Sequence, residues 1–171
     1  LSKKENNLLP KDSIILIDTF VIPGYYSKDR YYNGLWDSLN DDQKKKVFFL
    51  PTIAYTSIKN FISVFSELRK AKRQFLIKED YLKFSDIFFA VFYCLRVQFL
   101  NIKSLVSEDI DFSHIFNNEL KEKSAYDLSI EGILNYRFIK RLKQNGINLK
   151  LVIDWWENQA TDKGLNKGIN T

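Results

Sequence analysis

The chain has 171 residues, 45% of them hydrophobic and 27% charged, a composition that suits one globular domain with a single core. Its one cysteine excludes a disulfide framework, and one cysteine with one histidine argues against a zinc site. The net charge of +5 comes from scattered lysines, which argues against specific nucleic-acid binding. Nucleotide phosphates and an anionic membrane surface remain open as partners.

The two ends of the chain suggest a piece of a longer protein. We expect residues 1–12 to form a polar linker and residues 13–171 to form a single α/β domain. The sequence starts at Leu1, contains no methionine and ends without a stop signal for a fold, so we expect truncation at both ends. Cys94 lies in an apolar run, as a buried thiol of a reducing compartment would, which predicts a cytoplasmic location.

The first predicted element is a strand. Residues 13–20, SIILIDTF, form an apolar, β-branched run interrupted by Asp18, which is typical of a parallel strand buried on both faces. The Pro-Gly pair in residues 21–26 predicts a loop. Residues 27–40 predict a short helix capped by Ser27. Its apolar face consists of Leu35, Trp36 and Leu39.

A second strand and a helix follow. Residues 46–50, KVFFL, predict a strand that Pro51 closes. Ser57 is the predicted cap of the next helix, because apolar residues recur after it at intervals of three and four. The members of this stripe are Ile58, Phe61, Ile62, Phe65 and Leu68.

Residues 78–103 predict one long helix that is apolar around most of its circumference. Such a helix is buried centrally or faces a partner. The apolar run within it is interrupted by Arg96 and Gln98 and is too short to cross a membrane.

The last third of the chain predicts a helix and a strand. Residues 109–118 indicate only a weak, short element, whereas residues 124–144 predict a third long helix. Asn145 and Gly146 stop that helix, as a left-handed cap would, and residues 149–153 form the third strand. Three strands separated by helices predict an α/β, Rossmann-like fold: a small parallel sheet flanked by several long helices.

Two acidic residues sit where predicted strands give way to loops. Asp18 and Asp154 would point into one crevice if their strands are neighbours, because parallel strands present ligand sites at their carboxyl ends. Either acid could accept a hydrogen bond from a sugar hydroxyl or act as a general base. The alternative is that each caps a helix or orders its own loop, and for each acid alone this is the simpler interpretation.

The residues after Asp154 are the sharpest sign of a site. Glu157 offers a proton-transfer group, and Asn158 and Gln159 offer donors and acceptors suited to sugar or phosphate oxygens. Trp155 and Trp156 offer flat apolar faces on which a ring can stack. Alternatively, one tryptophan belongs to the core and the polar run satisfies a buried loop. Binding is favoured, because burying so many polar and amphipathic side chains is costly.

Residues 161–164, TDKG, predict the start of a helix. Its free amides, together with Asp162 and Lys163, could contact an anionic or polar group of a substrate. The alternative, which is the simpler one here, is that Thr161 is an ordinary cap and Asp162 favours the helix dipole.

Residues 135–138, NYRF, followed by residues 152–164, VIDWWENQATDKG, resemble a stretch of bacterial surface-carbohydrate (capsule and lipopolysaccharide) biosynthesis proteins. Those proteins look like glycosyltransferases of the two-Rossmann-domain architecture. The resemblance spans about 30 residues, and its most specific part is the pattern Asp-Trp-x-Glu-Asn-Gln-x-x-Asp-Lys-Gly.

The resemblance implies that this chain is the acceptor-side half of a sugar-transfer enzyme for bacterial surface polysaccharide. A nucleotide-sugar donor would bind a second domain beyond the C-terminus, and this chain would need no cofactor of its own and would be inactive alone. The implied partners are a sugar or glycan acceptor, that missing C-terminal domain and, peripherally, the inner membrane. Position and chemistry make Glu157 the first catalytic candidate, with Asp154 as the alternative proton acceptor. No metal ligand is predicted.

Two other functions remain open. The first is a non-catalytic α/β interaction domain that docks a partner through the aromatic helix predicted at residues 78–103. The second is nucleic-acid binding, which the basic balance and the aromatic content suggest, but it requires a clustered basic face.

Overall fold

The computed structural model describes residues 13–22, 32, 34–53, 60–155, 157 and 159–171. The chain divides into two compact units. We call the first, Leu1–Tyr81 with Arg141–Trp156, the sheet unit. The second, Leu82–Lys140 with Glu157–Thr171, is the helical unit. The linker predicted for residues 1–12 lies outside the described residues.

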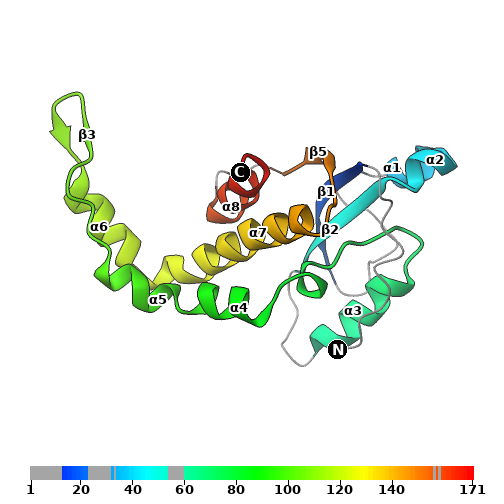
Figure 1. Ribbon diagram of the computed structural model, residues 1–171, viewed down its shortest axis with the longest axis horizontal. Coiled ribbons are helices and arrows are strands. Elements are labelled where there is room, and N and C mark those ends of the chain that lie inside the picture. Colours follow the sequence, from blue (N-terminus) through cyan, green and yellow to red (C-terminus); the bar gives the residue numbers. More distant parts are fainter. Residues whose placement is uncertain (1–12, 23–31, 33, 54–59, 156, 158) are drawn as a thin grey trace. The chain divides into compact units, whose positions relative to one another are not determined.

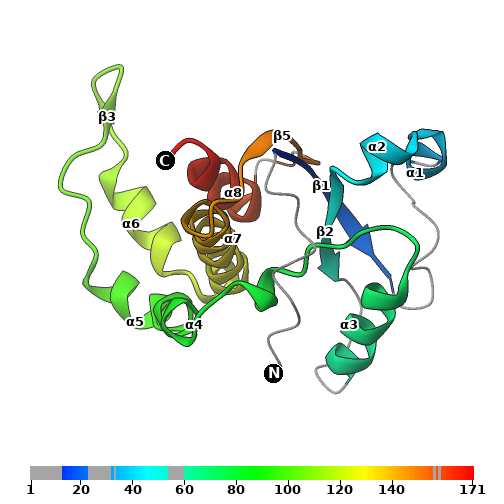
Figure 2. The ribbon, with the colours of Figure 1, turned by 45° about the vertical axis from the view of Figure 1, so that its right-hand side comes forward.

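The sheet unit contains a three-stranded parallel sheet of order β2-β1-β5 (Figures 1 and 2). Its strands are β1 (Ile14–Val21), β2 (Val47–Ile53) and β5 (Leu149–Ile153). β1 is the central strand and carries several fully buried side chains, as its apolar run predicts. Together with the eight α-helices among the described residues, the sheet confirms the predicted α/β, Rossmann-like fold.

One core cluster of the sheet unit forms around Ile17, Val47 and Phe49. The short helix α1 (Leu35–Ser38) packs against it, and Trp36 meets the ring of Phe49 edge-on at a centroid distance of 6.1 Å. The predicted apolar face of this segment is therefore confirmed: Leu35, Trp36 and Leu39 all contact the cluster. The predicted cap, Ser27, lies outside the described residues.

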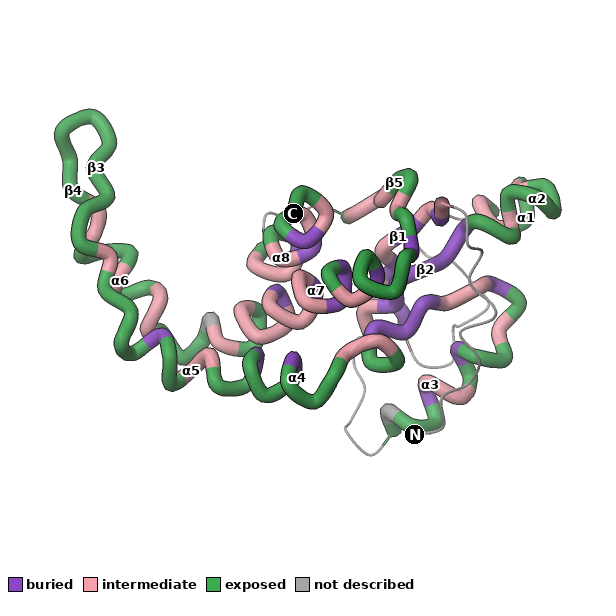
Figure 3. Tube along the Cα trace, in the orientation of Figure 1, coloured by how far each residue is buried: buried purple, intermediate pink, exposed green. Residues whose placement is uncertain are grey.

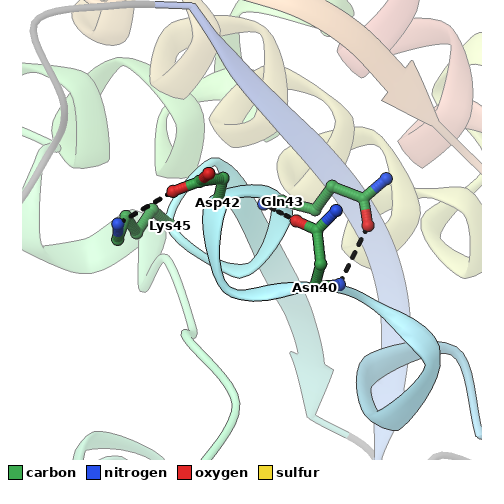
Figure 4. A network of polar contacts seen from close by, with 4 residues as sticks. All are labelled: Asn40, Asp42, Gln43 and Lys45. Carbon is green, nitrogen blue, oxygen red and sulfur yellow. Dashed lines mark hydrogen bonds and ion pairs between the residues drawn. The ribbon is translucent and has the colours of Figure 1, made fainter.

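The start of the next helix, α2 (Asp41–Lys44), is fixed by hydrogen bonds between residues of the helix and its N-cap. The Asn40 side chain accepts a hydrogen bond from the backbone N–H of Gln43, and the Gln43 side chain accepts one from the backbone N–H of Asn40 (Figure 4). This reciprocal capping box satisfies two amides that a helix start leaves unpaired. Lys45 adds an ion pair with Asp42 at 2.9 Å, on the exposed surface.

The prediction that Pro51 closes the second strand is wrong, because β2 continues to Ile53. Phe49, two residues before Pro51, donates its N–H to the carbonyl of Gln74, and its own carbonyl accepts from the N–H of Leu76. Both bonds lie on the side of β2 away from β1. Since strand residues two apart point their amides to the same side, the missing N–H of Pro51 also falls on that outer side. Proline there removes no hydrogen bond of the sheet.

Helix α3 (Phe61–Lys70) has Asn60 as its N-cap residue. The predicted cap, Ser57, and the first residue of the predicted stripe, Ile58, lie outside the described residues. Val64 and Leu68 are buried in a second cluster with Val21 and Ile77, and Phe65 packs against it. The prediction that Ile62 shares this stripe is wrong, since its side chain is 83% exposed. Residues two apart on a helix face opposite directions, so Ile62 and Val64 cannot both point inward.

Tyr81 follows the short 3-10 helix η2 (Lys78–Asp80). Burial, assisted by the charge of Asp80, raises the pKa of its phenol to about 12. As the pH rises, the unfolded chain loses this proton first, so the stability that the neutral phenol contributes is complete below about pH 10 and disappears toward about pH 12. We expect Tyr81→Phe to lose less stability than the parent protein between about pH 9 and pH 11.5 in urea unfolding. Equal losses would contradict the raised pKa.

The helical unit contains short helices, a hairpin and most of one long helix. The predicted single helix at residues 78–103 is wrong. The chain instead forms α4 (Phe84–Val91), α5 (Tyr93–Arg96) and the 3-10 helix η3 (Val97–Phe99). The N-terminus of α4 is capped at Lys83, whose backbone N–H donates to the Asp86 carboxylate at 2.9 Å.

The weak element predicted at residues 109–118 corresponds to the second strand of a hairpin and most of a helix. β3 (Val106–Ser107) and β4 (Ile110–Asp111) form an antiparallel hairpin, and α6 (Ser113–Lys121) follows it. The turn places Glu108 and Asp109 at positive φ values of 50° and 65°, as a tight two-residue hairpin requires. No Asn-Gly or Asp-Gly pair marks this turn, so the sequence pattern does not reveal it.

The long helix predicted at residues 124–144 is confirmed as α7 (Tyr126–Gln144), preceded by the 3-10 helix η4 (Lys123–Ala125). Its predicted stop is also confirmed. Gly146 has φ 76° and donates to Lys143, and Ile147 donates to the carbonyl of Leu142. These two bonds form a Schellman motif, which allows the chain to leave the helix and enter β5.

Candidate functional site

Two of the predicted site residues come together between β1 and β5, where Asp154 directly follows β5. The prediction that Asp18 ends its strand is wrong, because β1 continues to Val21. From β1 the chain proceeds to β2 on one side, and β5 lies on the other side of β1. This arrangement makes the gap between β1 and β5 a topological switch point, the position where open α/β sheets bind ligands. In the register of the two strands Ile17 lies opposite Ile153, so Asp18 and Asp154 come next along neighbouring chains.

Asp18 is held from the other neighbouring strand. It lies opposite Leu50 in the register of β1 and β2, and its carboxylate accepts a hydrogen bond from the hydroxyl of Thr52 at 3.3 Å. Asp18 and Thr52 are both half-buried. The Thr52 hydroxyl therefore helps to fix the direction in which the half-buried Asp18 carboxylate points.

Thr52 is a site residue that sequence reasoning missed. The predicted strand stopped at Pro51, which left Thr52 in a loop rather than beside Asp18. The apolar and β-branched character of Leu50, Thr52 and Ile53 is the signal that could have extended the strand. Proline is compatible with such a strand when its nitrogen faces outward.

Asp154 is the first residue after β5, and it is half-buried. Trp155 follows it and is 44% exposed, so part of this tryptophan reaches the solvent next in sequence to the carboxylate. Trp156, the second predicted stacking residue, lies outside the described residues, as does Asn158.

The remaining predicted residues belong to the helical unit, at the start of α8 (Ala160–Ile169). The Asp162 carboxylate is buried and accepts the backbone N–H groups of Glu157 at 3.0 Å and Gln159 at 2.9 Å. Gln159 is the N-cap residue and completes a capping box with Asp162. The prediction that Thr161 is the cap is therefore wrong, because the helix has already begun at Ala160.

Glu157 and Lys163 are exposed. The Glu157 carboxylate accepts a hydrogen bond from the side-chain amide of Gln159 at 3.0 Å, which orients it at the surface of the helical unit. The predicted cluster thus divides between the two compact units. Asp18, Asp154 and Trp155 belong to the sheet unit, and Glu157, Gln159, Asp162 and Lys163 belong to the helical unit.

The sheet edge suits hydroxyl-rich ligands. Ionised carboxylates accept hydrogen bonds from sugar hydroxyls, and a tryptophan face complements the apolar face of a pyranose ring. A search of the described residues found no group of three or more His, Cys, Asp or Glu side chains that could hold a metal ion. In the same part of the chain, no helix is both long and apolar enough to cross a membrane.

In comparisons with protein-family models, with curated proteins and with solved structures, nothing matched this chain.

Proposed function

We propose that this chain is the acceptor-side half of a sugar-transfer enzyme of bacterial surface-polysaccharide synthesis, and that the carboxyl edge of its sheet binds the acceptor sugar. The observation that carries the proposal is that Asp18 of β1 and Asp154, the residue after β5, are next to each other in register at the topological switch point. The resemblance of residues 152–164 to surface-carbohydrate biosynthesis proteins supports the substrate class.

The proposed reaction needs one proton acceptor in this chain. The acceptor hydroxyl oxygen attacks the anomeric carbon of a nucleotide-sugar bound by another part of the full-length protein. Its proton passes to a carboxylate, and the nucleotide leaves with the electrons of the broken bond. Asp154 is the favoured base because it lies at the sheet edge, and the exposed carboxylate of Glu157 is the alternative.

The other residues of the sheet edge would bind rather than react. Asp18, oriented by the Thr52 hydroxyl at 3.3 Å, accepts a second hydroxyl of the sugar. Trp155 covers the apolar face of the ring with its exposed surface. Together they would hold the attacking hydroxyl in one direction, which is the main contribution that a binding domain makes to such a reaction.

Ligand titration of the 171-residue chain tests this site. Saturation-transfer NMR with a panel of methyl glycosides should find at least one that binds, with the strongest transfer to protons on the apolar ring face. Asp18→Asn keeps the shape but removes the charge, so we expect about tenfold weaker binding. Asp37→Asn, an exposed acid on α1, is the matched control and should bind as the parent does.

Two results would count against the sugar site. One is the absence of saturation transfer to every glycoside of the panel. The other is equal affinity of the Asp18→Asn and Asp37→Asn variants, which would place the bound sugar elsewhere on the chain.

A non-catalytic interaction domain remains the second candidate function, and one observation favours it. The segment from α4 to η3 exposes several large apolar side chains in place of the buried helix that its composition suggests. The residues of this segment all belong to the helical unit, so they are different from the sheet-unit residues proposed to bind sugar.

A further inference from the structure

The segment of α4, α5 and η3 carries an outward row of large apolar side chains. Their spacing along the chain is four, four, three and four residues, which keeps them on one side of a helical path. We call this row the aromatic stripe. Its members and their exposed fractions are Phe84 (80%), Phe88 (62%), Phe92 (45%), Leu95 (55%) and Phe99 (89%).

The helical path continues through the junction between α4 and α5. Phe92 donates its N–H to the carbonyl of Phe88 at 3.0 Å, and Arg96 donates to the carbonyl of Phe92 at 3.1 Å. The rings of Phe88 and Phe92 stack at a centroid distance of 5.8 Å. The helical path is therefore continuous from Phe88 to Arg96, and two neighbouring rings of the stripe are in contact.

The opposite side of the same segment is already packed. Asp86, Ala90 and Val97 are 1%, 0% and 2% exposed, and the tube of Figure 3 shows purple at intervals along a path that is mainly green. Tyr93 also turns inward, meeting the ring of Tyr126 edge-on at 6.1 Å. The segment thus has one face committed to the helical unit and a second, apolar face directed to the solvent.

The exposed charges of this segment all have one sign. Residues 82–104 contain three basic residues, Lys83, Arg96 and Lys103, and all three are exposed. The only acidic residue among residues 82–104 is Asp86. It is buried and forms an ion pair with Arg137 at 3.9 Å, so it does not offset the basic charge at the surface.

We propose that the aromatic stripe docks the protein on a bilayer that contains anionic lipid. A phenylalanine-rich face bordered by basic residues is the pattern of helices that lie in the membrane interface. A second copy of the chain fits less well, because a two-fold contact through the stripe would bring the same cations together. The segment lies on the bilayer and does not cross it, since the described residues contain no spanning helix.

Arg96 has the side chain suited to the boundary between the lipid acyl chains and the water. Its guanidinium lies over the ring of Phe89 at 3.9 Å from the centroid, so a cation is held directly against an exposed aromatic side chain of the segment. In the docked protein the phenylalanine rings enter the boundary of headgroups and acyl chains, and Arg96 reaches the lipid phosphates. This inference is independent of sugar transfer.

Vesicle co-sedimentation of the 171-residue chain tests the proposal. We expect binding to phosphatidylcholine vesicles with about 30% phosphatidylglycerol and much weaker binding to phosphatidylcholine alone. The double variant Phe88→Ser, Phe99→Ser should bind about tenfold or more weakly. Arg96→Gln should bind the anionic vesicles about fivefold more weakly.

The matched control is Ile62→Ser, which removes an equally exposed apolar side chain from α3 of the sheet unit and should bind as the parent does. Because Phe88 and Phe99 are mostly exposed, the double variant should keep the parent's circular dichroism spectrum and melting temperature. A depth measurement adds a second readout. In a Cys94→Ala background, a spin label at Phe99→Cys should gain oxygen accessibility on vesicles, and one at Ile62→Cys should not.

Three results would overturn the proposal. The first is no binding of the parent protein to the anionic vesicles. The second is unchanged binding of the double variant with an intact fold. The third is a concentration-dependent dimer that the double variant abolishes, since a second copy would then cover the stripe.

Discussion

Asp154→Asn is expected to slow sugar transfer by the full-length protein by about 10²–10⁴-fold, the usual contribution of a general base. The amide keeps the size of the side chain and one acceptor oxygen, but it cannot take up the proton of the attacking hydroxyl. The loss should therefore fall on kcat, with KM for the acceptor changed little. Radiolabelled transfer from a nucleotide-sugar, measured at varied acceptor concentration, separates the two constants.

Glu157→Gln serves as the companion variant, because Glu157 is the other catalytic candidate. If Asp154 is the base, Glu157→Gln should retain most of the activity, and the reverse pattern would move the base to the start of α8. Asp37→Asn controls for the loss of any one carboxylate. Near-normal rates in both the Asp154 and Glu157 variants, with the fold intact, would remove the catalytic proposal altogether.

Gly164→Ala is expected to lower the free energy of unfolding by about 2–3 kcal/mol, the upper range for an overpacked contact. Within the helical unit, a Cβ atom on Gly164 would overlap the carbonyl oxygen of Gly132 and would lie 2.7 Å from the Gly132 Cα atom. Both neighbouring atoms are backbone, so no side chain can move aside. The gain in helix propensity from glycine to alanine, about 1 kcal/mol, is smaller than this cost.

The same close approach recurs along α8. A Cβ atom on Gly168 would lie 2.8 Å from the Cβ atom of Ile139 on α7, so two glycines four residues apart let the helices come together. Lys167→Ala, on the exposed side of α8, is the matched control and should change stability by less than about 0.5 kcal/mol. Urea unfolding followed by circular dichroism measures both, and equal stabilities of the two variants would contradict the tight helix crossing.

Local sequence patterns predicted the regular elements with strong signals. The β-branched run of residues 13–20, the helix of residues 124–144 and its stop at Gly146 all appear in the structure, because each depends on nearest neighbours along the chain. The weakly marked elements were wrong or missed. The hairpin turn at Glu108 and Asp109 adopts positive φ without the glycine that usually announces it.

The candidate site was predicted only in its parts. The sequence correctly placed Asp154 directly after a strand, but it wrongly placed Asp18 at a strand end, since β1 continues to Val21. Strand order, which the sequence does not reveal, decides that the two acids are neighbours. Thr52 was missed because the direction in which the Pro51 nitrogen points depends on the pairing of Phe49 with the segment of Gln74 and Leu76.

By itself, the sequence determined the fold class, the strongest helix and strand signals, and the chemical types available for a site, because hydrophobic period and local capping act over a few residues. Only the tertiary structure decided which apolar residues are buried. The stripe that includes Phe88 and Phe99 has the same composition as a core helix, and its exposure follows from which face the helical unit already occupies. The tertiary structure likewise decided that the buried carboxylate of Asp162 holds the start of α8, since a side chain's partners depend on the folded path of the chain.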